Sequence, residues 1–285
     1  MSVSNPRGVA EGESEMTTQR LGDVADAASR GRSAARPDRR VDQHIVVRFQ
    51  YPVWFTRGVF RPENPRLLET IVQQEPERRH RLAVFVDSGV AAARPGLVDE
   101  ISAWAQLHAA AVRLVAPPRV VPGGETIKCD LGIVRDLLHS IARGGLCRHS
   151  FVVAVGGGAV LDAVGFCASL VHRGLRMIRI PTTVLAQNDA GVGVKTGINT
   201  DGGKNTAGTF APPYAVLNDL EFLKTLPDEH WIGGTSEAFK VAILKDREYF
   251  EFLEAHAEAI PRRDEIVMEE LIVRCAELHL EHIRE

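Results

Sequence analysis

Residues 151–205 read FVVAVGGGAVLDAVGFCASLVHRGLRMIRIPTTVLAQNDAGVGVKTGINTDGGKN, and this stretch decides the fold. The apolar run 151–155 predicts a buried strand, and the pattern over 160–170 predicts a helix. Between them stand Gly156, Gly157 and Gly158. Glycines let backbone N–H groups approach a ligand closely, and a helix start adds partial positive charge, so the turn is a candidate phosphate or pyrophosphate site. Glycine pairs are also common in purely structural strand–helix turns, and that alternative stays open.

The residues after this turn favour a ligand site. A second strand is predicted over 177–180, followed by Pro181, Thr182 and Thr183. The polar segment beyond them is rich in charged and amide side chains: Asp189, Lys195, Asn199, Lys204 and Asn205. A purely structural loop has little use for so many of them. Asp162, in the first turn of the predicted helix, can hold a ribose hydroxyl or an amide of the turn.

Composition narrows the class of protein. The chain has 285 residues, 45% of them hydrophobic, and a net charge of −3, which favours neither a nucleic-acid nor a membrane partner. Its four cysteines, without CxxC spacing, indicate reduced thiols and a cytoplasmic protein. No apolar run reaches transmembrane length.

The order of elements predicts an α/β part followed by a helical part. Residues 1–43 are short of large apolar residues and are predicted to be disordered. Alternating strands (45–49, 53–56, 82–86 and 112–115) and helices (67–74 and 96–108) indicate a parallel sheet with helices on both faces over 44–183. Residues 184–285 are predicted as a helical domain, with a strand at 214–217 and helices at 222–225, 231–245, 247–259 and 265–284.

Ligands of such sheets bind at the carboxyl ends of strands, which directs attention to two more segments. Asp87 follows the predicted strand 82–86, and the loop 123–128 follows another. Glu125 in that loop is suited to accept hydrogen bonds from a ribose diol. It is equally suited to the start of a helix, where a carboxylate is stabilised by the helix dipole.

These motifs together resemble a known family. GGGAVLD, HRG, IPTT, GVKTGIN, GGKN, FLKTLP and SEAFK occur in this order in 3-dehydroquinate synthase and the wider sugar phosphate cyclases. The resemblance runs from about residue 45 to the last residue. It implies a parallel-sheet NAD-binding domain followed by an all-helical domain that binds metal and substrate, acting on a small-molecule sugar phosphate as a homodimer.

The resemblance also implies which residues contact NAD. They are Asp87, Gly123, Gly124, Glu125, Thr126, Ile127, Lys128, Gly156, Gly157, Gly158, Ala159, Val160, Leu161, Asp162, Thr182, Thr183, Lys195, Lys204, Phe222, Leu223, Lys224 and Thr225. Alternatives remain for some of them, since Thr182 and Thr183 are also suited to ending a strand, and Phe222 and Leu223 to the core.

Glu237 and Lys240 are spaced as a surface ion pair on one helix face. The resemblance instead implies that Glu237 is the first protein ligand of a catalytic zinc, with cobalt as an alternative, and that Lys240 faces the substrate. The two zinc histidines of the family have no counterpart here, so we expect a C-terminally incomplete copy. His279 and His282 precede the family's ligand positions, and we do not expect them to bind metal.

The implied reaction is the NAD-dependent oxidation, phosphate elimination, re-reduction and aldol closure of a seven-carbon sugar phosphate. Implied catalytic residues are Arg173, Asp189, Lys195, Asn205 and Lys240. The first reading is 3-dehydroquinate synthase of the shikimate pathway. Val194, where the family has glycine, and His279, where it has lysine, favour a second reading, a sedoheptulose 7-phosphate cyclase that forms a valiolone-like product. A metal-dependent polyol dehydrogenase and a non-catalytic NAD-binding fragment are further alternatives.

Overall fold

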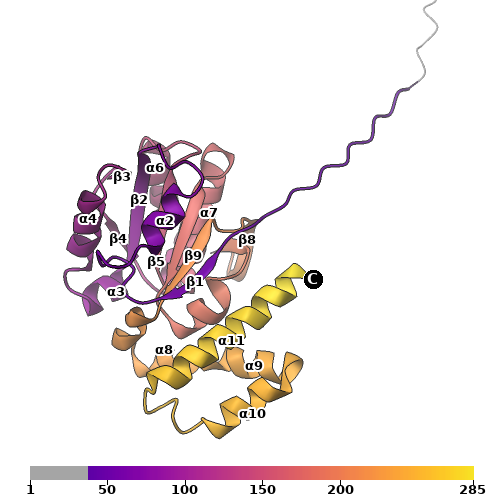
Figure 1. The fold of residues 1–285 in the computed structure, drawn as a ribbon. Helices are drawn as coiled ribbons and strands as arrows, with labels where there is room; N and C mark the ends of the chain where they lie inside the picture. Colours follow the sequence, from indigo (N-terminus) through magenta and orange to yellow (C-terminus); the bar gives the residue numbers. More distant parts are fainter. Residues whose placement is uncertain (1–37) are drawn as a thin grey trace, which may run out of the picture. The chain divides into compact units, whose positions relative to one another are not determined.

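The structure, a computed structural model, describes residues 38–285 (Figure 1). It separates a leading unit, Met1–Arg48, from a compact body, Phe49–Glu285. The tail predicted over 1–43 lies mostly outside the described residues. The strand predicted over 45–49 is wrong: these residues form neither helix nor strand, and Ile45 and Val46 are 81% and 83% exposed. An apolar run becomes a strand only beside a partner, and β1 (Val53–Thr56) occupies the edge of the sheet instead.

The body is built on a seven-stranded sheet in which every pairing is parallel, as predicted. The strand order is β1-β9-β6-β5-β2-β3, with β4 also paired to β2. The strands beyond β1 are β2 (His80–Asp87), β3 (Val112–Leu114), β4 (Arg119–Val121), β5 (Phe151–Gly156), β6 (Arg176–Pro181) and β9 (Ala215–Asp219). Parallel pairing brings the carboxyl ends of all these strands to one edge of the sheet.

Helices cover both faces of the sheet, and the side-chain alternation of β5 shows why its sequence is apolar throughout. Val152 and Ala154 pack with α6 (Leu131–Arg143) and α7 (Gly158–Leu170) on one face. Val153 and Val155 pack with α2 (Arg66–Val72) and α4 (Leu97–Leu107) on the other. A strand buried on both faces needs a continuous apolar run rather than an alternating one.

The polar segment after β6 is a folded feature rather than a loop. A π-helical turn, η2 (Ala186–Ala190), leads into an antiparallel hairpin of β7 (Lys195–Thr200) and β8 (Gly203–Phe210). Shorter helical segments complete this part of the chain: α3 (Ser88–Ala93), α5 (Thr126–Cys129) and η1 (Val171–Arg173).

The helical part follows β9 and has its own buried core around Trp231, Tyr249 and Leu271. Its elements are η3 (Leu220–Thr225), α8 (Asp228–Gly233), α9 (Thr235–Lys245), α10 (Arg247–Ala255) and α11 (Glu265–Arg284). In Figure 1 the helices α9, α10 and α11 lie together beside one end of the sheet. The domain boundary expected at residue 184 stays a prediction. Strand β9 of the sheet comes after that residue.

The helix predicted over 231–245 is two helices, α8 and α9, which meet at Gly234. A Cβ atom on Gly234 would lie 2.6 Å from the backbone nitrogen of Leu185 and 2.6 Å from Cβ of Val184. The Asn188 side-chain amide donates to the Gly234 carbonyl over 3.1 Å. Only a glycine permits this contact between the start of α9 and the segment after β6.

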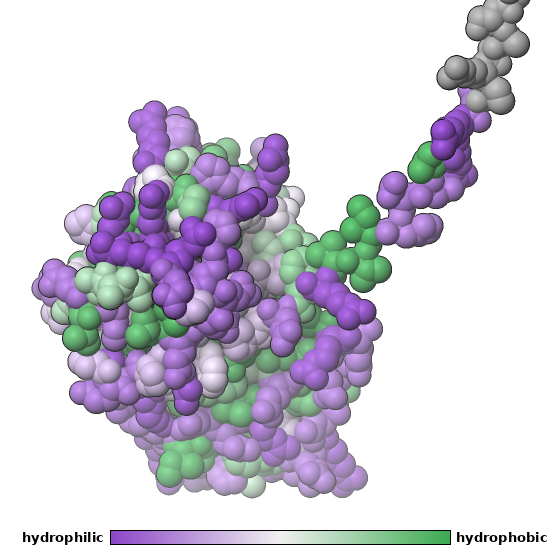
Figure 2. All heavy atoms as spheres, turned by 45° about the horizontal axis from the view of Figure 1, so that its top comes forward, coloured by the Kyte–Doolittle hydropathy of each residue, from purple (hydrophilic) through white to green (hydrophobic). Residues whose placement is uncertain are grey.

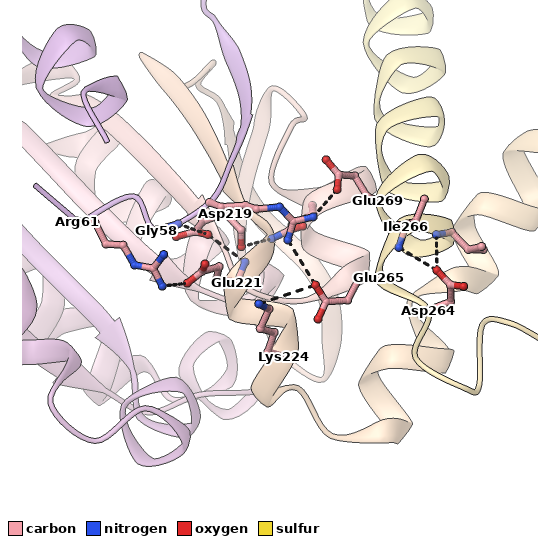
Figure 3. A network of polar contacts seen from close by, with 12 residues as sticks. Gly58, Arg61, Asp219, Glu221, Lys224, Asp264, Glu265, Ile266 and Glu269 are labelled. Carbon is pink, nitrogen blue, oxygen red and sulfur yellow. Dashed lines mark hydrogen bonds and ion pairs between the residues drawn. The ribbon is translucent and has the colours of Figure 1, made fainter. Parts of the chain in front are cut away.

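Charged side chains join the sheet to α11 (Figure 3). Arg57 lies next to β1 and pairs with Glu269 at 2.5 Å, and Glu265 is shared between Arg57 and Lys224 at 3.6 and 3.9 Å. Beside them, the buried Asp219 carboxylate accepts hydrogen bonds from the backbone nitrogens of Gly58, Val59 and Glu221 at 2.8–3.0 Å. Asp219 therefore fixes the turn after β1 to the end of β9.

The remaining features agree with the composition. Hydrophilic residues cover most of the face of the body seen in Figure 2, with small hydrophobic areas between them. All four cysteines are free, as predicted. Among residues 38–285, no helix combines the length and the apolar content that crossing a bilayer requires.

We expect Asp219→Ala to lower the free energy of unfolding by about 3 kcal/mol, because three backbone N–H groups lose a buried charged acceptor. Urea unfolding measures the change. Asp228→Ala is the matched control: it removes an exposed carboxylate that pairs with Arg263 at 2.7 Å, and we expect a loss below about 1 kcal/mol. Equal losses for the two variants would contradict the role assigned to Asp219.

Candidate active site

A cavity of about 700 Å³ opens at the carboxyl edge of the sheet, between the strand ends and α8. Twelve of the residues expected to bind NAD line it. They are Asp87, Gly123, Gly124, Glu125, Gly157, Gly158, Ala159, Val160, Thr182, Thr183, Phe222 and Thr225. The rest of the wall includes Glu229 and His230 of α8, which the sequence did not single out.

The glycine turn forms one wall of the cavity. Strand β5 ends at Gly156 and α7 begins at Gly158, and no side chain caps the start of this helix. The first backbone N–H groups of a helix have no partner within it, so those of α7 are available to a ligand. A Cβ atom on Gly158 would come within 3.1 Å of Cβ of Ala190, a tight contact that favours glycine at this position.

The loop after β4 forms the facing wall and is held close to Asp87. The Asp87 carboxylate accepts from the Gly89 nitrogen at 2.8 Å and thereby caps α3. A Cβ atom on Gly123 would lie 2.3 Å from that carboxylate, and Gly124 has a φ of +69°. Glycine at both positions is therefore required for the loop to reach Asp87 and turn away.

The two threonines after β6 have different roles. The Thr183 hydroxyl accepts from the Ala186 nitrogen at 3.1 Å and so starts the π-helical turn. Thr182 is 2% exposed, and its hydroxyl has no hydrogen-bond partner within the part of the chain that the structure describes. An unpaired buried hydroxyl is unfavourable, and Thr182 lines the cavity, so a ligand bound there is one candidate for the missing partner.

A buried lysine of α5 joins α7 to the hairpin. Lys128 is 4% exposed, and its ammonium donates to Asp162 at 2.8 Å and to the side-chain oxygen of Asn205 at 2.5 Å. Burial raises the pKa of Asp162, and the hydrogen bond and charge of Lys128 oppose this rise. Lys128, Asp162 and Asn205 were expected to contact ligands; here their side chains bind one another.

Two of the residues expected to face the substrate, Asp189 of η2 and Lys240 of α9, lie near the expected metal ligand Glu237 and His279 of α11. Glu237 pairs with Lys240 at 2.5 Å, and Asp189 lies 3.3 Å from the imidazole of His279. Burial raises the pKa of Asp189, with His279 opposing and Glu237 adding to the rise. The hydrogen bond to Glu237 raises the pKa of Lys240.

Among the described residues, Glu237, the expected metal ligand, is not part of a complete metal site. Glu237 is engaged by Lys240, and residues 38–285 contain no group of three histidine, cysteine, aspartate or glutamate side chains placed to hold a metal ion. A catalytic zinc needs about three protein ligands. The described residues therefore do not by themselves form a metal site, and we derive no chemical step through a metal.

Several expected residues lie apart from the cavity. Arg173 follows α7, whose 13 residues span roughly 20 Å, so it stands at the opposite edge of the sheet from the glycine turn. Leu223 and Lys224 line a second, smaller cavity of about 280 Å³, together with Arg57 and Glu265. Ile127 and Leu161 are buried in the core, as is Phe222, which also reaches the large cavity. Lys195 and Lys204 are exposed on the hairpin.

Sequence reasoning missed Arg179, a buried arginine on β6. Its guanidinium donates to the carbonyls of Gly191 and Gly193 at 3.1 and 2.6 Å, and to that of Lys195 at 3.3 Å. Burial lowers the pKa of Arg179 to about 10, and the Asp162 charge opposes this. The sequence feature that could have revealed Arg179 is a single arginine within the apolar strand segment MIRIP. The hydrogen bonds of Arg179 fix the segment that carries Asp189 and Lys195.

Several known proteins are similar to this chain in sequence. The family model for the N-terminal part of 3-dehydroquinate synthase matches residues 119–233. The 3-dehydroquinate synthase of Alkaliphilus metalliredigens is 42% identical over 155 residues, which are 54% of this chain and 43% of that protein. The 2-epi-5-epi-valiolone synthase of Streptomyces glaucescens is 36% identical over 233 residues, which are 79% of this chain and 55% of that protein.

A solved structure shares both parts of the fold. It is a 2-epi-5-epi-valiolone synthase from Streptomyces hygroscopicus subsp. jinggangensis with NAD⁺ and Zn²⁺ bound, which is 28% identical. The match has a TM-score of 0.72 and covers 86% of this chain and 64% of that one. The chain spans about half the length of the curated relatives it matches, from 42% to 55%. Over the part that it spans, the chain is similar in sequence and in fold to the sugar phosphate cyclases, which include 3-dehydroquinate synthase.

Proposed function

We propose that this protein binds NAD in the large cavity and serves as a sugar phosphate cyclase that closes a carbocycle from a seven-carbon sugar phosphate. One observation carries the cofactor assignment. The uncapped start of α7 and the unpaired hydroxyl of Thr182 border the same cavity. The start of α7 is suited to bind an anion, and the Thr182 hydroxyl is suited to bind a hydrogen-bonding group of the same ligand.

Each wall supplies part of the recognition of a dinucleotide. The backbone N–H groups at Gly158 and Ala159 would hold the pyrophosphate, and the carboxylates of Asp87 and Glu125 would accept hydrogen bonds from ribose hydroxyls. Bound NAD would supply the chemistry of taking a hydride from a ring hydroxyl and returning it later. The chain's own residues orient the cofactor and the substrate for that exchange.

The sugar phosphate would lie toward the hairpin and α9. Lys195 and Lys204 offer exposed ammonium groups that suit a phosphate dianion, and Lys240 adds a third near Asp189. Asp189 can accept a hydrogen bond from a substrate hydroxyl. Arg173 has no part in this site within one chain, because it lies at the other edge of the sheet.

A second substrate class is favoured by His279. Because its imidazole is paired with Asp189, it offers a substrate carboxylate no unpaired cation of the kind that a lysine would provide. Sedoheptulose 7-phosphate lacks that carboxylate, whereas the keto acid phosphate used by 3-dehydroquinate synthase has one. The two substrates therefore distinguish the two candidate reactions.

We expect Thr182→Val to weaken NAD binding about tenfold, because the nearly isosteric change removes one hydrogen bond, while leaving the free energy of unfolding unchanged or higher. Calorimetric titration with NAD and urea unfolding measure the two effects. Thr70→Val is the matched control, since Thr70 is a buried threonine of α2 outside the cavity, and NAD affinity should not change. Unaltered NAD affinity in Thr182→Val would count against this cavity.

We expect the 285-residue chain, supplied with NAD and Zn²⁺, to release little or no inorganic phosphate from the keto acid phosphate or from sedoheptulose 7-phosphate, because residues 38–285 do not form a metal site. A colorimetric phosphate assay follows both substrates. Lys195→Met should still weaken binding of the sugar phosphate by about tenfold in a calorimetric titration, because it removes a charged hydrogen-bond donor to phosphate. NAD-dependent release of phosphate from either substrate would contradict the first expectation and identify that sugar phosphate as the substrate.

A further inference from the structure

Asn199 lies where the hairpin departs from regular pairing. Ile198 of β7 is opposite Ala207 and Thr200 is opposite Gly203, and the register shifts between them. Between these two pairs β7 has one residue, Asn199, whereas β8 has three, Lys204, Asn205 and Thr206, so the bulge lies on β8. Asn199 faces the bulge and is buried, at 8% exposure.

The Asn199 side chain makes hydrogen bonds in two directions. Its amide nitrogen donates to a carboxylate oxygen of Glu125 at 2.9 Å and lies 3.2 Å from the sulfur of Cys129. Its amide oxygen accepts from the backbone nitrogen of Asn205 at 2.7 Å. Because a carboxylate only accepts and a backbone N–H only donates, a single amide orientation satisfies both partners.

These bonds close a ring of contacts between the cavity wall and the hairpin tip. Asn205 accepts from the ammonium of Lys128 at 2.5 Å, and the Lys128 backbone nitrogen donates to the Glu125 carbonyl at 3.0 Å. Asn205 itself has a φ of +54°, a conformation that costs energy and needs support from its surroundings. Asn199 supplies that support through the bond to the Asn205 nitrogen.

We propose that Asn199 is a positioning residue that makes the Glu125 loop and the hairpin tip order as one unit. It holds one carboxylate oxygen of Glu125 at the cavity wall and sets the backbone that carries Lys204 and Asn205. The consequence for the cofactor rests on the proposed function, because it takes the cavity to be the NAD site. The coupling between the Glu125 loop and the hairpin tip does not rest on the proposed function, since it follows from the hydrogen bonds alone.

Amide hydrogen exchange of the unliganded chain tests the coupling. Asn199→Asp keeps the acceptor for the Asn205 nitrogen but replaces the donor to Glu125 with a second carboxylate. We expect exchange to rise about tenfold over both 123–130 and 200–206. The control is Thr206→Val, which removes the hydroxyl bonded to the Thr200 nitrogen at 2.8 Å and should loosen 200–206 alone.

A combined variant provides the rescue. Adding Glu125→Gln to Asn199→Asp puts an amide donor opposite the new carboxylate and restores the bond with its polarity reversed, so exchange should return to near the unaltered level in both segments. A general loss of packing would not be repaired in this way. Exchange that rises in 200–206 alone, or that stays high in the combined variant, would overturn the proposal.

Calorimetric titration with NAD separates this inference from the proposed function. We expect Asn199→Asp to weaken NAD binding about tenfold. If the unaltered chain binds no NAD, the proposed function fails, while the exchange measurement still decides the role of Asn199. If the chain binds NAD and Asn199→Asp leaves the affinity unchanged, the positioning role toward the cofactor is wrong.

Discussion

Parallel pairing throughout the seven-stranded sheet is the constraint on which the site depends. It brings the ends of β2, β5, β6 and β9 to one edge, although they are far apart in the chain. Each end then does something different: Asp87 caps a helix, Gly156 opens the glycine turn, Pro181 leads into two threonines, and Asp219 anchors the turn after β1. The cavity exists because these ends share an edge, and the helices that return between them keep water from both faces of the strands.

The sequence predicted β5, the glycine turn and α7 correctly, because a doubly buried strand and an apolar helix both leave long apolar runs. It failed at 45–49, because an apolar run does not say whether a partner strand is available. The hairpin 195–210 was missed, since a two-stranded ribbon of glycine, threonine and asparagine has no apolar pattern to detect. Helix α6 was detectable: Asp130 caps it by accepting from Gly132 and Ile133, and its apolar residues recur at helical spacing. The partners of Lys128 could not be predicted from the sequence, because Asp162 and Asn205 approach it only in the folded chain.

Two buried cations shape the site without facing the cavity. Arg179 donates to four carbonyls, three of them in residues 191–195 next to Asp189, and Lys128 donates to Asp162 and to Asn205 of the hairpin. Removing such charges from water is costly, and these hydrogen bonds offset the cost only when the surrounding backbone takes one particular course. Each cation therefore acts as a template for the chain around it. Lys195 and Lys204 nearby are exposed and therefore accessible to a ligand. The buried charges order the backbone, whereas the exposed charges are available for binding.

The contact at Gly234 has a consequence for movement. No methyl group fits between Gly234 and the backbone after β6, and the Asn188 side chain donates to the Gly234 carbonyl. These two contacts fix the start of α9 to the segment that follows β6. The ion pairs of Arg57 and Lys224 with α11 are partly exposed and easier to exchange for water. Helix α11 is held by buried contacts as well, since Ala276 packs with Val192 and with Val216 of β9, and His279 pairs with Asp189. Both α9 and α11 are therefore expected to move with the sheet, so that Glu237 and His279 keep their positions relative to Asp189.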